Sequence, residues 1–260
     1  MRWIRFSLQG HTAYGILDGD RIVEVAGDPF RGYERTSRAH SLSDVKIEVP
    51  VIPPTFYCVG LNYAAHIREA AAKLGLPADL PRQPDVGYRA INALIAHEEP
   101  VVIPADAMKV QYEGELVVVI GKRAQHLSEA DALSCVLGYT IGNDVSERTW
   151  QKADRTLWRA KNTDTFKPMG PWIETDVDLD ALETIVRVNG KETTRFRTND
   201  MLFGVAAYIA TITRYITLYP GDVLWMGTDG TSPDLKAGDT VEVEITGIGT
   251  LRNPFTARLL

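Results

Sequence analysis

The stretch YEGELVVVI, residues Tyr112–Ile120, places two acidic residues directly before a continuous apolar run. A short apolar run rich in β-branched residues is typical of a strand that is buried on both faces. Because side chains two residues apart on a strand point to the same face, Glu113 and Glu115 are expected to project together, roughly 7 Å apart. Gly114 would lie on the opposite face, where its missing side chain lets another part of the chain approach closely.

These two carboxylates form the first candidate metal site. Two like charges beside an apolar core repel each other and lose hydration. A divalent cation between them removes both penalties, and ligation by oxygen alone favours Mg²⁺ or Mn²⁺, with Ca²⁺ also able to occupy such a site in vitro. The alternative is that both carboxylates lie on the solvated face of an edge strand, and the E-x-E pattern alone does not distinguish the two.

Strand segments dominate the rest of the chain as well. The first fifty residues contain three of them, with Asp18-Gly19 as a tight turn, and a polar stretch, Arg35–Asp44, separates them from the remainder of the chain. We therefore expect a small N-terminal β domain over residues 1–50 and a main domain over residues 51–260. The strands expected along the chain are Trp3–Leu8, Thr12–Ile16, Arg21–Val25, Phe56–Val59, Val101–Ile103, Gln111–Ile120, Tyr139–Asn143, Ile185–Val188, Lys191–Phe196, Val223–Met226, Thr240–Ile245 and Gly249–Leu251.

Helices are fewer, so the expected fold class is α+β and mainly β, with a few helices packed on a sandwich or barrel-like core. Asn189-Gly190 predicts a two-residue β-hairpin. The proline-rich segment Leu76–Asp85 predicts an irregular loop, either a lid or a plain surface connection. The expected helices run from an N-cap at Asn62 to about Leu74 with Gly75 beyond its end, from the capping box of Ser128 and Asp131 to near Val136, and over residues 201–216.

Composition narrows the function. The 260 residues carry 28 basic and 34 acidic side chains, a net charge of −6, so there is no basic surplus with which to bind nucleic acid. Cys58 and Cys135 are too few and too far apart for a disulfide framework or a cysteine zinc site, so any metal must be held by carboxylates or histidines. No apolar run reaches the ~18–20 residues of a membrane span, and no signal peptide is evident, so a cytoplasmic location is expected.

Two further groups of residues can carry chemistry. Asp144 follows the strand Tyr139–Asn143 and is either a third metal ligand or, with Glu147, the polar start of a helix. His66 and Glu69 lie three residues apart on one face of the expected helix, either as a general base with its orienting carboxylate or as a solvated ion pair. A lysine in the polar segment 159–171 could bind an anionic substrate. The remaining histidines are interpreted as structural: His11, His40, His97 and His126.

In this order the motifs resemble those of the fumarylacetoacetate hydrolase family. The likeness covers most of residues 51–260, and the first fifty residues resemble the small N-terminal domain of many members. The segments that carry it are Gly60–Tyr63 with His66 and Glu69, Glu113–Leu116, Asn143–Val145, Asp164–Phe166 with Pro168 and Gly170-Pro171, and Gly247–Asn253.

The resemblance implies the family's β-sandwich roll, a homodimer or larger homo-oligomer, and a Mg²⁺ or Mn²⁺ ion. It also assigns roles to individual residues. Glu113, Glu115 and Asp144 would be the metal ligands, His66, Glu69 and Lys161 the catalytic groups, and Arg148, Gln151 and Thr228 the substrate contacts.

The activity implied first is hydrolysis of a C–C bond in a small anionic 2,4-dioxo acid of the acylpyruvate or fumarylpyruvate type. The cation would stabilise the enolate, and the His–Glu pair would activate water. The alternative within enzymes is a decarboxylase or isomerase of 2-oxo-hept-ene-dioate intermediates in homoprotocatechuate-type aromatic catabolism. A non-catalytic β module that binds a metal or ligand is the alternative of another class.

Two departures from the family pattern lie near the expected substrate. An aromatic-x-Lys pattern is replaced by Gly87-Tyr88-Arg89-Ala90, and a Gly-Thr-Pro-x-Gly loop by Gly227-Thr228-Asp229-Gly230-Thr231. Asp229 adds a negative charge where an anionic substrate would bind, so substrate identity does not transfer from any single relative.

Overall fold

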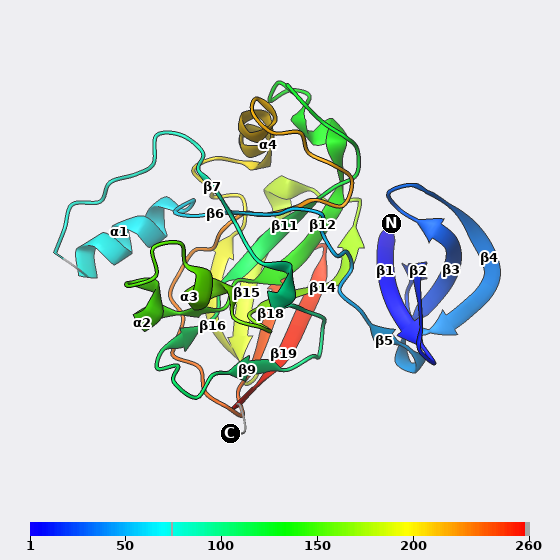
Figure 1. Cartoon of the computed structure of the whole chain (residues 1–260), viewed down its shortest axis with the longest axis horizontal. Coiled ribbons are helices and arrows are strands. Elements are labelled where there is room, and N and C mark those ends of the chain that lie inside the picture. The colour runs from blue at the N-terminus through cyan, green and yellow to red at the C-terminus, as the bar shows by residue number, and fades with distance from the viewer. Residues whose placement is uncertain (74, 258–260) are drawn as a thin grey trace.

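The protein is organised by mixed, mainly antiparallel sheets, as Figure 1 shows for the computed structural model, which describes residues 1–73 and 75–257. Among these residues twelve strands form one sheet, five form a second and two form a short ribbon. Along the large sheet the order is β4 (Gly32–Ser41), β3 (Arg21–Asp28), β2 (His11–Asp18), β1 (Arg2–Leu8), β14 (Lys167–Glu174), β12 (Val136–Asn143), β11 (Gly114–Ile120), β17 (Val223–Trp225), β6 (Phe56–Val59) and β7 (Val86–Tyr88), with β5 (Lys46–Ile47) on β1 and β8 (Leu94–Ile95) on β14.

The second sheet covers one face of the main part of the first. Four short α-helices and four 3₁₀ helices complete the described structure, and the predicted class, mainly β with a few helices, is confirmed. The second sheet has the order β16 (Lys191–Arg197), β15 (Glu183–Val188), β18 (Thr240–Ile245), β19 (Gly249–Ala257) and β9 (Val101–Ile103); the ribbon pairs β10 (Val110–Gln111) with β13 (Ser146–Glu147); the helices are α1 (Ala64–Lys73), α2 (Arg148–Gln151), α3 (Trp158–Asn162) and α4 (Val205–Thr213).

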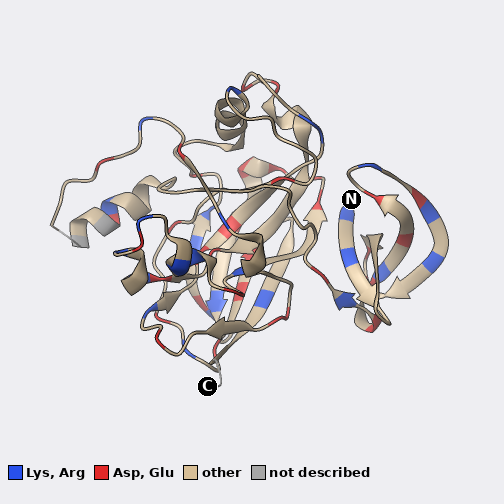
Figure 2. Ribbon diagram, in the orientation of Figure 1, with Lys and Arg blue, Asp and Glu red and all other residues tan. Residues whose placement is uncertain are grey.

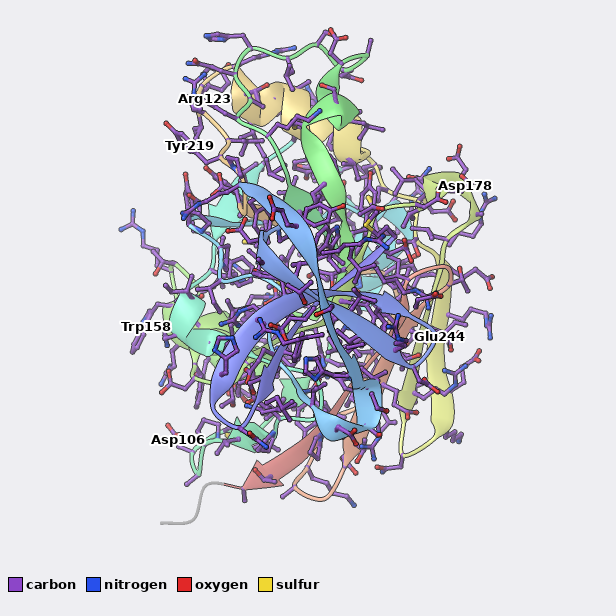
Figure 3. The ribbon with its side chains drawn as sticks, turned by 90° about the vertical axis from the view of Figure 1, so that its right-hand side faces the viewer. Asp106, Arg123, Trp158, Asp178, Tyr219 and Glu244 are labelled. Atoms are coloured by element: carbon purple, nitrogen blue, oxygen red, sulfur yellow. The ribbon has the colours of Figure 1, made fainter. Side chains whose placement is uncertain are left out.

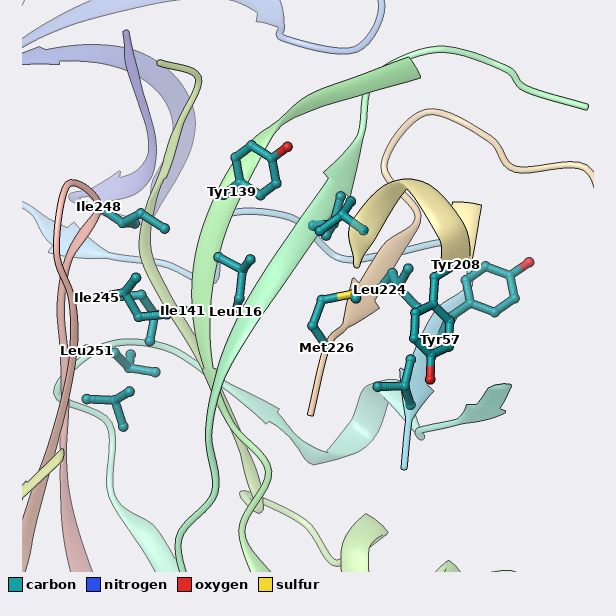
Figure 4. Packing of buried hydrophobic residues seen from close by; sticks show 14 of the residues in the cluster. Tyr57, Leu116, Tyr139, Ile141, Tyr208, Leu224, Met226, Ile245, Ile248 and Leu251 are labelled. Atoms are coloured by element: carbon teal, nitrogen blue, oxygen red, sulfur yellow. The ribbon is translucent and has the colours of Figure 1, made fainter. Parts of the chain in front are cut away.

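Strand β11 is buried on both faces, as its continuous apolar sequence predicts. Leu116, Val118 and Ile120 contribute to a core cluster that includes residues of the second sheet and of α4 (Figure 4). Val117 and Val119 point the other way and belong to a second cluster. Because consecutive side chains serve two cores, the register of this strand is fixed, and so is the direction in which Glu115 points.

The N-terminal strands β1–β4 form a meander that lies to the side of the main body (Figure 1). It joins the large sheet where Arg2 and Trp3 of β1 pair with Glu174 and Ile173 of β14. The prediction of a polar separator at Arg35–Asp44 is wrong, because most of that stretch belongs to β4. Strand β4 has no buried residue and lies at the sheet edge, so it lacks the alternation that reveals a strand, and its mixed charges (Figure 2) are typical of protected edges.

The first helix starts later than predicted, at Ala64. Asn62 does not cap it, because its amide donates to the carbonyls of Phe203 and Met226 and its Oδ1 accepts from the Phe203 amide. Gly75 has the left-handed conformation expected beyond a helix end (φ +66°). The residue predicted to end the helix, Leu74, lies outside the described residues.

The other two predicted helices are shorter in the structure. The one expected over 201–216 becomes α4, because residues 201–203 bond to the segment around Asn62 instead of continuing the helix. The capping-box bonds between Ser128 and Asp131 form, but they close a turn that leads only into a 3₁₀ helix, Ala132–Cys135.

The predicted hairpin and the proline-rich loop are both present. The Asn189-Gly190 hairpin joins β15 to β16 with both residues at positive φ, and Leu76–Asp85 is irregular. The expected strand Gln111–Ile120 is interrupted at Tyr112 and Glu113, so Glu113 precedes β11 and does not lie within it.

Figure 3 shows Trp158 of α3 at the edge of the molecule, where its indole is largely exposed. Within the described part of the chain, no helix combines the length and apolarity of a membrane-spanning segment.

Candidate active site

Three buried carboxylates converge at the end of strands β11 and β12. One oxygen each of Glu113, Glu115 and Asp144 lies within 4.8 Å of the others, and all three residues are buried. Glu115 belongs to β11, Glu113 immediately precedes it, and Asp144 immediately follows β12. The cluster therefore combines two sequence segments that are separate candidates when only the sequence is considered.

The antiparallel pairing of β11 with β12 brings these carboxylates together. Gly114 lies opposite Asn143, whose side-chain oxygen accepts from the Glu113 amide over 3.0 Å. The Asp144 amide in turn donates to the Glu113 carbonyl over 2.9 Å. These bonds fix the backbone on both sides of the strand ends, and so fix where the side chains start.

Two of the predicted cationic residues contact the cluster. The ammonium of Lys161, on α3, lies 2.5 Å from Glu113 Oε2 and 2.8 Å from Asp144 Oδ2. Arg148 Nη1, at the start of α2, lies 2.7 Å from Glu113 Oε1 and also donates to Gln151 over 2.9 Å. Gln151 thus contacts the site through the arginine.

Two further cations at the site were not assigned from sequence. Arg89 donates to Asp144 from both Nε and Nη2, at 3.2 and 2.9 Å, and Lys167 Nζ lies 2.7 Å from Asp144 Oδ1. Arg89 stands in the segment where the aromatic-x-Lys pattern is altered, so the departure from the family motif still supplies a positive charge. Lys167 stands in the polar segment 159–171, and its proximity to Lys161 in sequence was the only available hint.

Burial and neighbouring charges separate the three carboxylates. Burial raises the pKa of Glu115 well above its ordinary value, and the carboxylates of Asp144 and Glu113 raise it further. Burial also opposes ionisation of the other two, but the ammonium of Lys161 lowers the pKa of Glu113 on balance. The cations around Asp144 lower the pKa of that carboxyl well below its usual range.

This donor set fits a hard divalent cation. Its three acidic residues offer only oxygen, as Mg²⁺ and Mn²⁺ prefer, and their ligand atoms are already gathered away from solvent. Glu115 accepts a hydrogen bond from the Gly227 amide over 2.8 Å, which orients one of its oxygens. Ionising Glu115 next to two other carboxylates costs free energy, and a bound dication would remove this cost.

A cavity of about 260 Å³ opens beside the cluster, with Glu113 as part of its wall. His66, Glu69, Arg148 and Thr228 line the same cavity, together with the following residues 229–232. The structure therefore brings five of the nine predicted site residues to one cavity. Of the other four, Glu115 and Asp144 belong to the acidic cluster, Lys161 contacts that cluster, and Gln151 contacts Arg148.

His66 is oriented by a backbone group. Its Nδ1 lies 2.9 Å from the carbonyl oxygen of Gly230, in the loop that follows Thr228. Glu69 is exposed on the same side of α1 and lines the same cavity. The sequence predicts Glu69 as an orienting partner of the imidazole, and the structure adds this carbonyl, which no sequence pattern indicates.

Other segments named in the sequence are structural. Glu147, and not Asp144, caps a helix, since its carboxylate accepts from the Trp150 amide at the start of α2. Asp164 accepts from the Asn92 side chain, and the Thr165 hydroxyl accepts from the Val102 amide. This family-like segment thus anchors the loop after α3 and does not reach the cavity wall.

With this geometry in place, the comparisons with known proteins define the class. A model of the fumarylacetoacetate (FAA) hydrolase C-terminal domain matches residues 55–256, and a model named Rv2993c-like, N-terminal, matches residues 1–50. The chain belongs to the fumarylacetoacetate hydrolase family and is an enzyme of that family.

Several similar proteins match this chain over almost its full length. Protein Rv2993c of Mycobacterium tuberculosis is 38% identical over 268 residues, which cover 99% of both chains. The solved 5-carboxymethyl-2-hydroxymuconate delta-isomerase of Mycobacterium smegmatis is 37% identical with a TM-score of 0.90, covering 99% of this chain and 100% of that one. The 2-hydroxyhepta-2,4-diene-1,7-dioate isomerase of Mycobacterium marinum is also 37% identical, with a TM-score of 0.88 and 99% of each chain covered.

A more distant structure bears on the cation. The maleylpyruvate hydrolase of Sphingobium sp. SYK-6, solved in complex with manganese(II) and pyruvate, is 25% identical with a TM-score of 0.80, and the match covers 100% of each chain.

Proposed function

We propose that this protein is a divalent-cation-dependent enzyme that isomerises a small anionic 2-oxo acid by moving a proton between its keto and enol forms. The observation that carries the proposal is the position of the buried carboxylate cluster beside a cavity that also contains His66 and Arg148. The physiological ion would be Mg²⁺ or Mn²⁺, held by Glu113, Glu115 and Asp144.

The bound cation would act as a Lewis acid toward the oxo group of the substrate. Arg148 lies in the cavity wall, and its planar guanidinium suits the substrate carboxylate. Lys161 holds a positive charge next to Glu113 and Asp144, which favours negative charge developing on the substrate.

The residues that transfer protons lie on helix α1. The imidazole of His66 takes a proton from one substrate atom and returns it to another, so the composition of the substrate does not change. Glu69 faces the same cavity and can exchange that proton with solvent, while the Thr228 hydroxyl is placed to contact the substrate.

The similar proteins favour isomerisation over hydrolysis. The two mycobacterial structures that match over the full chain are named isomerases of 2-hydroxy-diene-dioate compounds, so we place the substrate among such intermediates of aromatic catabolism. Decarboxylation of a related 2-oxo acid would use the same enolate-stabilising groups.

Hydrolysis of a C–C bond in a 2,4-dioxo acid is the second candidate. It is supported by the similarity to the manganese-containing maleylpyruvate hydrolase and by the same His66, which would then take its proton from water. Isomerisation and hydrolysis would use the same side chains and differ in which substrate bond lies next to them.

Product analysis separates these candidates. The purified protein is incubated with Mg²⁺ or Mn²⁺ and either 2-hydroxyhepta-2,4-diene-1,7-dioate, 5-carboxymethyl-2-hydroxymuconate or an acylpyruvate, and the products are identified by mass and by proton NMR, which distinguishes isomers of equal mass. We expect an isomer of unchanged mass. Loss of carbon dioxide would identify a decarboxylase, and two acids formed with one added water would identify a hydrolase.

The variant His66→Ala tests whether the site is catalytic. We expect turnover to be lost while the bound cation is retained. Full turnover in this variant, or no turnover of any of these substrates by the cation-loaded wild type, would contradict the proposal and favour a module that binds a metal or ligand without catalysis.

A further inference from the structure

The hydrogen bond between His66 and Gly230 determines which ring nitrogen carries a proton. Nδ1 lies 2.9 Å from the Gly230 carbonyl oxygen, and a carbonyl oxygen can only accept. Nδ1 must therefore be the donor in both the neutral and the protonated ring. In the neutral ring this leaves Nε2 as the atom with a free lone pair.

The loop that presents this carbonyl has little freedom. Gly230 has a φ of +78°, and a Cβ built there would lie 2.6 Å from Cγ2 of Thr194 on β16. The loop therefore passes so close to the edge strand of the second sheet that only glycine fits. The position of the Gly230 carbonyl oxygen is fixed by this contact and by the hydrogen bonds of the Gly230 amide and the Thr231 carbonyl on either side of it.

Tyr112 connects this loop to the acidic cluster. Its hydroxyl lies 2.7 Å from Thr194 Oγ1, which donates to the Thr231 carbonyl over 2.9 Å. Because that threonine gives its own proton to the carbonyl, Tyr112 can be the donor to the threonine oxygen. The Tyr112 amide also donates to Ser232 Oγ over 3.1 Å, so this buried tyrosine holds the loop through both backbone and side chain.

We infer that the Gly230 carbonyl holds His66 in the Nδ1–H tautomer with Nε2 as the basic atom, and that Tyr112 is a positioning residue that keeps this carbonyl in place through Thr194. The catalytic meaning of the tautomer rests on the proposed function, whereas the tautomer itself does not. Tyr112 directly precedes Glu113, so one short segment would align both the proton-transfer group and the carboxylate cluster.

The tautomer is measured by NMR of protein labelled with ¹⁵N-histidine, at a pH where the ring is neutral. The His66 signals are assigned from their loss in His66→Gln. We expect His66 to show a protonated Nδ1 and an unprotonated Nε2. A protonated Nε2 in the folded wild-type protein would overturn the inference.

The role of Tyr112 is tested with Tyr112→Phe, which removes only the hydroxyl. We expect kcat to fall about tenfold, part of the ~10²–10⁴-fold that a general base contributes, with KM and cation affinity unchanged. The His66 spectrum should also show a mixture of tautomers. Thr194→Val should have the same two effects and serves if Tyr112→Phe folds poorly.

Tyr14→Phe is the matched control, because the Tyr14 hydroxyl donates to the Pro50 carbonyl in the N-terminal meander, away from the loop. It should change neither kcat nor the His66 spectrum. If both Tyr112→Phe and Thr194→Val leave the tautomer and kcat unchanged, the positioning role is wrong. If the Nδ1–H tautomer is found but His66→Ala retains turnover, the inference stands and the proposed base is wrong.

Discussion

Among the buried acidic side chains of the described residues, two arrangements contrast clearly, and only one of them looks like a site. In the N-terminal meander, Glu24 of β3 is buried, and its carboxylate forms an ion pair with Arg38 and a hydrogen bond with His40, both on β4, the next strand in sequence. In the main body, Glu113, Glu115 and Asp144 are gathered within 4.8 Å of one another. The first arrangement pairs one carboxylate with nearby donors, and the second forces like charges together.

Their partners differ in the same way. Both partners of Glu24 lie on one adjacent strand, so residues close in sequence offset the free-energy cost of burying its carboxylate. Asp144 contacts Arg89 from one segment of the main body, and Lys161 and Lys167 from another. Even with these cations, burial and the other two carboxylates raise the pKa of Glu115 well above its ordinary value. A buried acid alone therefore does not indicate function, whereas mutually repelling acids beside a cavity do.

The largest difference between the two places should appear when one carboxylate is removed. We expect Glu115→Ala to weaken Mn²⁺ binding by at least about a hundredfold and to abolish turnover, since even indirect support of a ligand is worth ~10–100-fold. The control Glu24→Gln should leave both within about twofold. Metal content by mass spectrometry and product formation measure the effect, and unchanged values for Glu115→Ala would mean that the two places do not differ in function.

Removing an arginine from each place comes next in size. Arg89→Met should cost about 3–5 kcal/mol of unfolding free energy, because it leaves a buried carboxylate without its bidentate partner. Arg38→Met should cost only about 0–1 kcal/mol, since Arg38 is 63% exposed. Urea denaturation of both variants without added metal tests this, and equal losses would contradict the contrast.

Addition of a cation should stabilise the wild-type protein. At a Mn²⁺ concentration one hundred times its Kd, binding to the native state alone contributes about 2.7 kcal/mol, which raises Tm. Thermal denaturation with and without Mn²⁺ should show this shift in Glu24→Gln but not in Glu115→Ala. A shift of the same size in both variants would mean that the ion binds elsewhere.

The smallest effect is expected where the two regions join. Glu174 of β14 accepts from the N-terminal ammonium and from Arg2; burial opposes its ionisation, but these hydrogen bonds lower its pKa on balance. A lowered native pKa stabilises the fold above the unfolded carboxyl pKa, and that stability is lost as pH falls through the native value. Glu174→Gln should therefore cost about 1 kcal/mol at neutral pH and less in acid, as measured by urea denaturation at both pH values; a loss that grows on acidification would contradict this.

Sequence alone was informative where the physical signal is local. The apolar run after Glu115 predicts a strand buried on both faces, and Asn189-Gly190 predicts its hairpin, because each depends on neighbouring residues. Strand β4 was missed because an exposed edge strand has no alternation to reveal it. The helix expected over 201–216 is shorter in the structure because residues 201–203 form hydrogen bonds with a distant part of the chain. Phe203, for example, bonds to Asn62, which lies 141 residues earlier.

Within the site, too, features that depend on neighbouring residues could be predicted, and those that depend on distant residues could not. The pattern of Glu113 and Glu115 suggested a shared face, but Arg89 and Lys167 reach Asp144 only through tertiary pairing, which residue spacing does not encode. The contact of His66 with Gly230 involves a backbone carbonyl, and a carbonyl is present at every residue. Such partners become visible only once the fold is known.

The proposed cation site consists of Glu113, Glu115 and Asp144, at the end of β11 and β12. The most direct test is anomalous X-ray diffraction from crystals of the protein grown with Mn²⁺. We predict one strong anomalous peak enclosed by oxygens of these three carboxylates, absent in crystals of Glu115→Ala. An empty cluster in Mn²⁺-saturated wild-type crystals, with the ion absent or bound at another place, would show that these three carboxylates do not form the cation site.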